Sequence, residues 1–161
     1  MLADIVLDTN VLVHADNPEE VRQHASRELL IELRDRETHL CVDEGFDLNE
    51  LKNRSVIGCE YLKHLRFGML GLAVVAHLAS SLRVRQVSRS MPQGVARLIR
   101  QQGVPKGADR IFLYVAYNSQ SKTLTCHDFN DVPPAVRARL RDKIGLRILD
   151  AEESVAVLRV V

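Results

Sequence analysis

The segment Ile5–Val13 constrains the fold of this chain more than any other. Its aliphatic residues are interrupted in the middle by three polar ones, Asp8, Thr9 and Asn10. A run of apolar residues without polar alternation is typical of a parallel strand that is covered on both faces. In open α/β sheets, ligands bind beyond the carboxyl ends of such strands. We therefore expect Asp8 to project from a central strand into a functional crevice, although Asp and Asn are also common in turns and helix caps.

The rest of the chain alternates short apolar strands with amphipathic helices. We expect strands at 39–42, 82–87, 123–126 and 146–149, and helices at 17–36, from 55, at 95–101, from 108 and at 134–143. This alternation predicts an α/β fold with three layers, α/β/α, around a central and mostly parallel sheet. At 161 residues, the length suits a single domain over 1–161.

Composition narrows the class of protein. With 46% hydrophobic and 27% charged residues, the chain resembles an ordinary globular protein. Its cysteines, Cys41, Cys59 and Cys126, form no C-x-x-C pair and have no histidine at zinc-finger spacing, so neither disulfides nor structural zinc are expected. We expect no signal peptide and a cytoplasmic location. The apolar stretch 67–82 is too short for a membrane span and predicts a buried helix, with a homodimer surface as the alternative.

Charge is divided unevenly along the chain. Residues 1–60 hold 14 acidic and 6 basic residues, whereas residues 61–161 hold 16 basic and 7 acidic residues. Between Ser81 and Arg110 a single acid, Asp109, stands among seven basic residues: Arg83, Arg85, Arg89, Arg97, Arg100, Lys106 and Arg110. A basic stretch of this kind can bind phosphates, although a solvated helix face would have the same composition.

Several expected strands end in an acidic residue. Asp8, Asp43 or Glu44, and Asp128 would all project from the carboxyl edge of the sheet, and Asp109 would approach that edge from the start of a helix. The helix dipole favours an acid at the position of Asp109 whatever its function. Carboxylates brought close together repel one another, so a folded protein retains such a cluster chiefly around a cation. Oxygen ligands favour Mg²⁺ or Mn²⁺.

These motifs together resemble the PIN domain, the nuclease domain of toxin–antitoxin ribonucleases and RNA-processing nucleases. The resemblance rests on four short motifs: Leu7-Asp8-Thr9-Asn10-Val11, Glu60-Tyr61, Ala108-Asp109 and His127-Asp128. It covers roughly Ile5 to Leu149. It implies metal-dependent hydrolysis of phosphodiester bonds in RNA, preferably single-stranded, in which the ion lowers the pKa of a water molecule.

The resemblance also assigns roles to individual residues. Asp8, Asp109 and Asp128 match metal-ligating acids, with Asp131 as a possible outer ligand. Thr9 and Asn10 match the residues that orient the first acid. Glu60 matches the second catalytic acid, with Glu44 as the alternative. Two positions depart from the family pattern: Cys126 stands where Ser or Thr is frequent, and Asn130 stands where an acid is frequent. Both departures bear on the binding of a second metal ion more than on that of the first.

Partners and auxiliary residues follow from the same resemblance. Phosphates of the RNA are expected to contact Arg83, Arg85, Lys106 and Arg110, with Arg137, Arg139 and Arg141 as further candidates. Aromatic residues make up 4% of the chain, so base stacking is expected to contribute little. A protein inhibitor such as an antitoxin and a second copy of the chain are possible partners, and no membrane is expected. His127 is expected to orient or support its neighbours.

Two other functions remain open. An inert PIN-like module would bind RNA or a protein without cleaving it. A phosphatase of the haloacid-dehalogenase type would use a D-x-D motif, but here the second position is Asn10, which cannot transfer the required proton.

Overall fold

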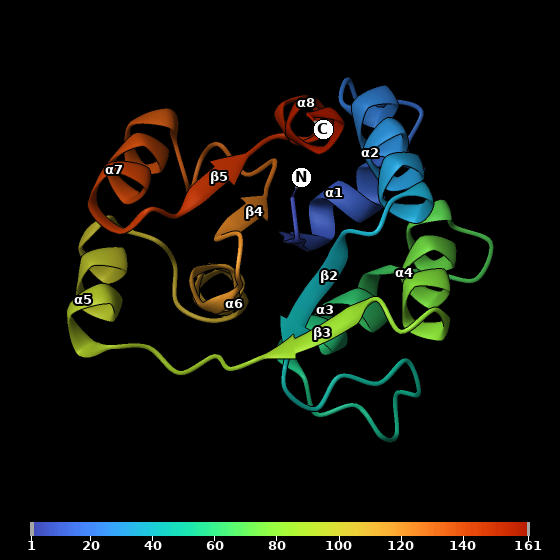
Figure 1. The fold of residues 1–161 in the computed structure, drawn as a ribbon, viewed down its shortest axis with the longest axis horizontal. Coiled ribbons are helices and arrows are strands. Elements are labelled where there is room, and N and C mark those ends of the chain that lie inside the picture. The colour runs from blue at the N-terminus through green and yellow to red at the C-terminus, as the bar shows by residue number, and fades with distance from the viewer. Residues whose placement is uncertain (1, 161) are drawn as a thin grey trace.

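The computed structural model describes residues 2–160 and contains a five-stranded sheet in which all paired strands are parallel (Figure 1). The strands are β1 (Asp4–Leu7), β2 (His39–Asp43), β3 (Val84–Val87), β4 (Thr123–Thr125) and β5 (Arg147–Leu149). Their spatial order is β3-β2-β1-β4-β5. β1 lies at the centre, and Ile5, Val6 and Leu7 are fully buried, as expected for a strand covered on both faces.

Eight helices within residues 2–160 cover this sheet. They are α1 (Thr9–His14), α2 (Gln23–Asp35), α3 (Val56–His64), α4 (Leu70–Ser80), α5 (Gln93–Gln101), α6 (Ala108–Asn118), α7 (Pro134–Ile144) and α8 (Ala151–Arg159). α2 packs against α4 and α8, whereas α6 packs against β1, β2 and β4. Figure 1 shows α2, α4 and α8 on one side of the sheet and α5, α6 and α7 on the other. The expected three-layer α/β/α fold is confirmed.

The strand order reverses next to β1, and this reversal creates the crevice. From β1 the chain adds β2 and β3 on one side and then crosses to β4 and β5 on the other. In such a sheet the helical connections of the two halves lie on opposite faces. A crevice therefore opens where the strand order reverses. Leu7 is in register with Thr125, and the backbone N–H of Asp8 donates to the Thr125 carbonyl at 2.9 Å. The residues after β1 and after β4 therefore emerge side by side.

The helix expected from Asn17 begins later. The side-chain oxygen of Asn17 accepts a hydrogen bond from the backbone N–H of Glu19, and its carbonyl accepts one from Glu20. These bonds form a turn, and α2 starts only at Gln23. The predicted N-cap, Asn17, was therefore wrong by five residues, since the N-cap of α2 is Arg22; Asn and Pro favour turns as strongly as helix starts.

The apolar stretch 67–82 forms α4, which buries Val74, Val75 and Leu78. The prediction of a buried helix is confirmed for the face of α4 that carries these three residues. None of the helices within residues 2–160 is long and apolar enough to cross a membrane.

Candidate active site

Asp8 stands at the carboxyl end of β1 and directly before α1. Although it occupies the N-cap position of α1, its side chain makes no capping hydrogen bond. The thiol of Cys126 lies 3.6 Å from Asp8 Oδ2, which brings the ends of β1 and β4 into contact. The carboxylate is therefore not committed to the helix and faces the crevice between the two strands.

Tyr61 of α3 fixes the backbone just before Asp8. Its ring is fully buried, and its hydroxyl donates a hydrogen bond of 2.6 Å to the carbonyl of Leu7. Burial raises the pKa of this hydroxyl well above its ordinary value, so it remains a donor. The Tyr of the Glu60-Tyr61 motif thus anchors the strand that carries Asp8, a role that the sequence analysis did not assign.

Four carboxylates from three separate segments line one small cavity at this edge. They are Asp8 after β1, Asp109 in the first turn of α6, and Asp128 and Asp131 in the loop after β4. The cavity has a volume of about 20 Å³, which is room for a single ion or water molecule. Its apolar lining comes from Phe112, Leu113, Leu124 and Val132. We call this space, which Asp8, Asp109, Asp128 and Asp131 line, the acidic cavity.

The electrostatics of the acidic cavity reflect crowding of like charges. Burial, with the charge of Asp109 next in size, raises the pKa of Asp8 to about 6. Burial also raises the pKa of Asp109, together with the charges of Asp131, Asp128 and Glu60. A hydrogen bond to Asp128 raises the pKa of Asp131. Burial first, and then the neighbouring acids, thus oppose ionisation of Asp8 and Asp109.

Asp109 reaches this position through the turn that begins α6. Gly107 precedes the helix with a φ of +104°, in a region that favours glycine. Asp109 follows in the first helical turn, where the helix dipole stabilises a negative charge. That dipole partly offsets the repulsion from the other acids.

The loop after β4 is held in place from two directions. Asp128 Oδ1 accepts the backbone N–H groups of Asn130 and Asp131 at 3.1 and 2.9 Å. From α7, Arg137 donates to the carbonyls of Cys126 and Asp128 at 3.0 and 3.1 Å, and to that of Val132 at 2.7 Å. The side chains of Asp128 and Asp131 are therefore presented by a loop with a defined backbone path.

The two candidates for the second acid differ in position. Glu60 does not line the acidic cavity, although its charge acts on Asp109, and its side chain lies 3.6 Å from His64. Glu44 is exposed in the turn after β2 and does not line the acidic cavity. Its neighbour Asp43 is fully buried, where it accepts the backbone N–H groups of Val56 and Ile57 and pairs with Arg89. The structure thus brings Glu60, and not Glu44, towards the other acids.

The polar residues after Asp8 have different environments. Thr9 is buried, and its hydroxyl has no hydrogen-bond partner among the described residues. Asn10 is exposed. A buried hydroxyl without a partner costs free energy, but Thr9 does not line the acidic cavity.

The basic residues expected to contact substrate do not gather at the acidic cavity. Arg83 precedes β3 and donates to the backbone carbonyls of Leu33, Arg34 and Arg36 at the end of α2. Arg85 pairs at 3.3 Å with Asp4, the first residue of β1. Both arginines therefore lie towards the amino ends of the strands, away from Asp8. Lys106 and Arg110 flank Asp109 in the chain, and Arg110 Nε donates to the carbonyl of Val104.

His127 is part of a structural pair of histidines. Its Nδ1 lies 2.8 Å from Nδ1 of His14, and its Nε2 accepts the backbone N–H of Ala151. Burial, with the neighbouring His14 next in size, lowers the pKa of His127 to about 4. The ring is neutral at pH 7 and supports the start of α8.

The donor set of the acidic cavity suits a hard divalent cation, because carboxylate oxygens are the ligands that Mg²⁺ and Mn²⁺ prefer. Within residues 2–160, no group of three or more His, Cys, Asp or Glu side chains is arranged so that it could hold a metal ion. Bare carboxylates repel one another, so a bound cation would have to draw these side chains closer. The residues present fit a cation that would draw them together.

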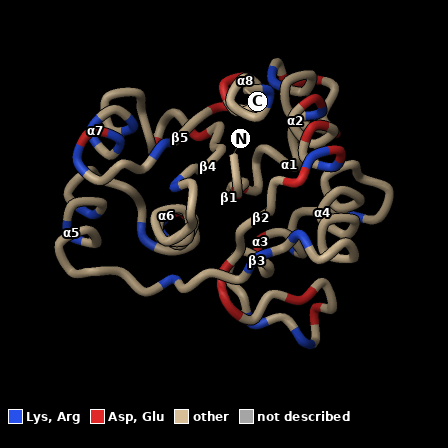
Figure 2. Tube along the Cα trace, in the orientation of Figure 1, with Lys and Arg blue, Asp and Glu red and all other residues tan. Residues whose placement is uncertain are grey.

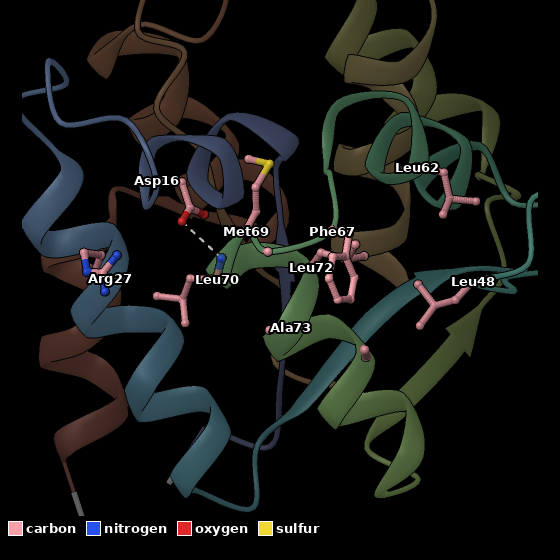
Figure 3. A pocket seen from close by; sticks show the side chains of 11 residues that line it. Asp16, Arg27, Leu48, Leu62, Phe67, Met69, Leu70, Leu72 and Ala73 are labelled. Atoms are coloured by element: carbon pink, nitrogen blue, oxygen red, sulfur yellow. Dashed lines mark hydrogen bonds between the residues drawn. The ribbon is translucent and has the colours of Figure 1, made fainter.

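A larger cavity lies elsewhere on the molecule and shares no lining residue with the acidic cavity (Figure 3). It has a volume of about 760 Å³ and mostly apolar walls, including Leu48, Leu62, Phe67, Leu70 and Leu72. At one end Asp16 accepts the backbone N–H of Leu70 at 3.1 Å, so this acid is committed to the start of α4. The two cavities are chemically distinct.

Comparisons of the chain with protein-family models, with curated proteins and with solved structures found no match.

Proposed function

We propose that this protein is a Mg²⁺- or Mn²⁺-dependent endoribonuclease of the PIN-domain type, acting on single-stranded RNA in the cytoplasm. One observation carries the proposal: Asp8, Asp109, Asp128 and Asp131, which are distant in sequence, line one cavity where the strand order reverses. Ligands bind at this place in open α/β sheets. Four carboxylates there are costly without a cation, and the raised pKa of Asp8 reports that cost.

Asp8, Asp109 and Asp128 would hold the cation, with Asp131 acting through its hydrogen bond to Asp128. When bound, the ion supplies an acidified water molecule and charge stabilisation for the phosphate. The chain itself contributes the fixed backbone at Leu7 and the braced loop after β4. Glu60 lies outside the acidic cavity, but its charge acts on Asp109.

The nature of the substrate follows from charge and from the PIN resemblance. Figure 2 shows basic residues on α5 and α7, which lie at one end of the molecule. α5 carries Arg97 and Arg100 without an acid. A phosphate backbone would meet this positive surface.

An inert PIN-like module that binds RNA or protein is the second candidate. Two observations favour it: within the described residues no group of three or more His, Cys, Asp or Glu side chains is arranged to hold a metal ion, and Asn130 is not an acid. Such a module would bind RNA without a metal-dependent cleavage step. The two candidates therefore differ in their response to divalent cations.

The test is thermal unfolding of chelator-treated protein with and without millimolar Mn²⁺ or Mg²⁺, for wild type and Asp8→Asn, followed by cleavage of end-labelled single-stranded RNA. A ligand specific for the folded state contributes about 3 kcal/mol at a hundred times its dissociation constant. We expect metal to stabilise the wild type alone and cleavage to require both metal and Asp8. Absence of any metal response in the wild type would reject the nuclease in favour of the inert module.

A further inference from the structure

A second polar cavity lies behind the loop that carries Asp128. It has a volume of about 440 Å³ and is formed by α7, β5 and the start of α8. Asp128 lines the acidic cavity, whereas the next residue, Phe129, lines this one. The loop after β4 is therefore a shared wall. We call this space the arginine cavity, because Arg137, Arg141 and Arg147 all line it.

Arg137 is a buried cation on which Glu153, Asp150 and Asp128 act as more distant negative charges. Its side chain is 8% exposed, and within residues 2–160 no carboxylate forms an ion pair with it. Its Nε and Nη2 donate to backbone carbonyls, but its Nη1 has no hydrogen-bond partner. The ring of Phe129 lies over the guanidinium, 4.1 Å from ring centroid to Cζ. A buried charge in this state is costly, and a nearby anion would reduce the cost.

The other two arginines leave donors available at the rim. Arg147 Nη2 donates to the hydroxyl of Thr123, and no described carboxylate forms an ion pair with this arginine. Arg141 is exposed and contacts only the neighbouring Asp142 through its Nε. Guanidinium groups match the geometry of phosphate oxygens and bind them through paired hydrogen bonds.

Two acids also line the arginine cavity, but both are engaged. Asp150 Oδ1 accepts the backbone N–H of Glu153 at 2.8 Å, and Glu153 Oε2 accepts that of Asp150 at 2.9 Å. This reciprocal capping box fixes the start of α8. One oxygen of each carboxylate therefore accepts from a backbone donor of the helix, and both acids lower the positive charge of the cavity, in which the guanidinium groups retain unused donors.

We propose that the arginine cavity binds a phosphate group, namely a phosphate of the RNA strand whose scissile bond lies at the acidic cavity. The RNA part of this assignment rests on the proposed nuclease function, whereas the phosphate chemistry rests on the cavity itself. The RNA strand passes over the loop after β4, with a cation on one side of that loop and guanidinium groups on the other. Pro134, Ala138 and Ile148 form apolar walls beside the guanidinium groups.

The first experiment measures RNA binding by the full chain in the presence of EDTA, which prevents cleavage. Fluorescence anisotropy of a labelled single-stranded oligoribonucleotide is recorded for wild type, Arg147→Gln, Arg141→Gln and the double variant. Arg34→Gln is the matched control, because this exposed arginine of α2 pairs only with its neighbour Asp35. Thermal unfolding of each variant establishes that it is folded.

We expect the double variant to bind RNA about tenfold more weakly, because charge-assisted hydrogen bonds are lost. The slope of log K against log salt should fall by about 0.7 for each phosphate contact removed. Arg34→Gln should bind like the wild type. Equal affinity of the wild type and the double variant would overturn the proposed RNA contact.

The second experiment separates a strand phosphate from free phosphate. Inorganic phosphate is added at constant ionic strength, and its effect on the unfolding midpoint is compared with that of chloride. The assignment is supported if phosphate raises the unfolding midpoint of wild type but not that of the double variant, and if the double variant also binds RNA more weakly. If phosphate stabilises the wild type but RNA affinity is unchanged by the substitutions, the cavity binds free phosphate and the RNA contact is rejected. Loss of cleavage with arginine-dependent RNA binding intact would reject only the nuclease.

Discussion

Asp8 occupies the N-cap position of α1, but its carboxylate makes no capping hydrogen bond. Its pKa of about 6 exceeds the ordinary value of 3.8, chiefly because it is buried. A carboxyl group with a raised pKa stabilises the folded state at low pH, and this contribution is lost as the pH rises through about 4 to 6. In metal-free buffer at pH 7.5, we expect Asp8→Asn to increase the free energy of unfolding by on the order of 2 kcal/mol. Urea unfolding measures this change.

The matched control is Asp150→Asn, at the N-cap of α8. Asp150 accepts a capping hydrogen bond from the backbone N–H of Glu153, so its carboxylate stabilises the start of α8. We expect that substitution to leave stability unchanged or to lower it slightly. If Asp8→Asn instead destabilised the metal-free protein, the conclusion that the ionised Asp8 carboxylate lowers stability would be wrong.

Tyr61 links α3 to the end of β1 through its bond to the Leu7 carbonyl. Tyr61→Phe removes the donor and leaves a buried carbonyl with one partner fewer. We expect a loss of about 1 to 2 kcal/mol in unfolding free energy and a smaller Mn²⁺-induced rise in the unfolding midpoint. Tyr114→Phe is a suitable control because it removes the hydroxyl of a partly exposed tyrosine of α6. An equal loss of metal response in both variants would exclude a specific role for Tyr61 at the site.

The sequence predicted Asp8, Asp109 and Asp128 as a group because each follows a recognisable strand or starts a recognisable helix. It could not distinguish Glu60 from Glu44, because that choice depends on how α3 is oriented. It also placed Arg83 with the substrate, whereas Arg83 caps the end of α2 about fifty residues away in the chain. Contacts of this kind depend on tertiary packing that local patterns do not encode.

At the scale of elements, α3 is positioned by two buried side chains at its first turn. Ser55 accepts from the backbone N–H of Gly58 and donates to Asp43, which also accepts from Val56 and Ile57. Ser55→Ala should lower the unfolding free energy by about 1 kcal/mol. Asp43→Asn should lower it further, because Arg89 loses its ion pair. Both changes are measured by urea unfolding.

The same variants test whether the acid at the end of β2 belongs to the metal site. Asp43 is committed to α3 and Arg89, so we expect folded Asp43→Asn to retain the Mn²⁺-induced rise in unfolding midpoint. Glu44→Gln should retain it as well, since Glu44 is exposed in the turn. A lost metal response in Asp43→Asn would place this acid among the ligands.

Helix and strand types were predictable, but several boundaries were not. The strands at 39–42 and 123–126 and the helix from 108 agree with β2, β4 and α6. α8 was missed, although Asp150 and Glu153 have the spacing of a capping box. Short apolar segments near the chain end match several structures equally well, so only the packing of α8 against α2 decides between them.

At the scale of the molecule, the uneven distribution of charge has a spatial counterpart. Figure 2 shows Lys and Arg on α5 and α7, at the end of the molecule beyond α6. The acids that form the site come from both halves of the chain, Asp8 from the acidic one and the other three from the basic one. A cation at the acidic cavity would therefore neutralise a local negative charge in a molecule whose basic residues gather on α5 and α7, which favours binding of phosphate.

This arrangement predicts competition between protons and metal ions. Because the pKa of Asp8 is about 6 without metal, protons occupy it below that pH and oppose metal binding. We expect the Mn²⁺-induced rise in unfolding midpoint to be largest above pH 7 and to disappear by about pH 5. Under single-turnover conditions, RNA cleavage should rise with pH, and the midpoint of that rise should move towards 6 as the metal concentration is lowered. A midpoint independent of metal concentration would show that Asp8 does not titrate in competition with the ion, and the acidic cavity would then not be the metal site.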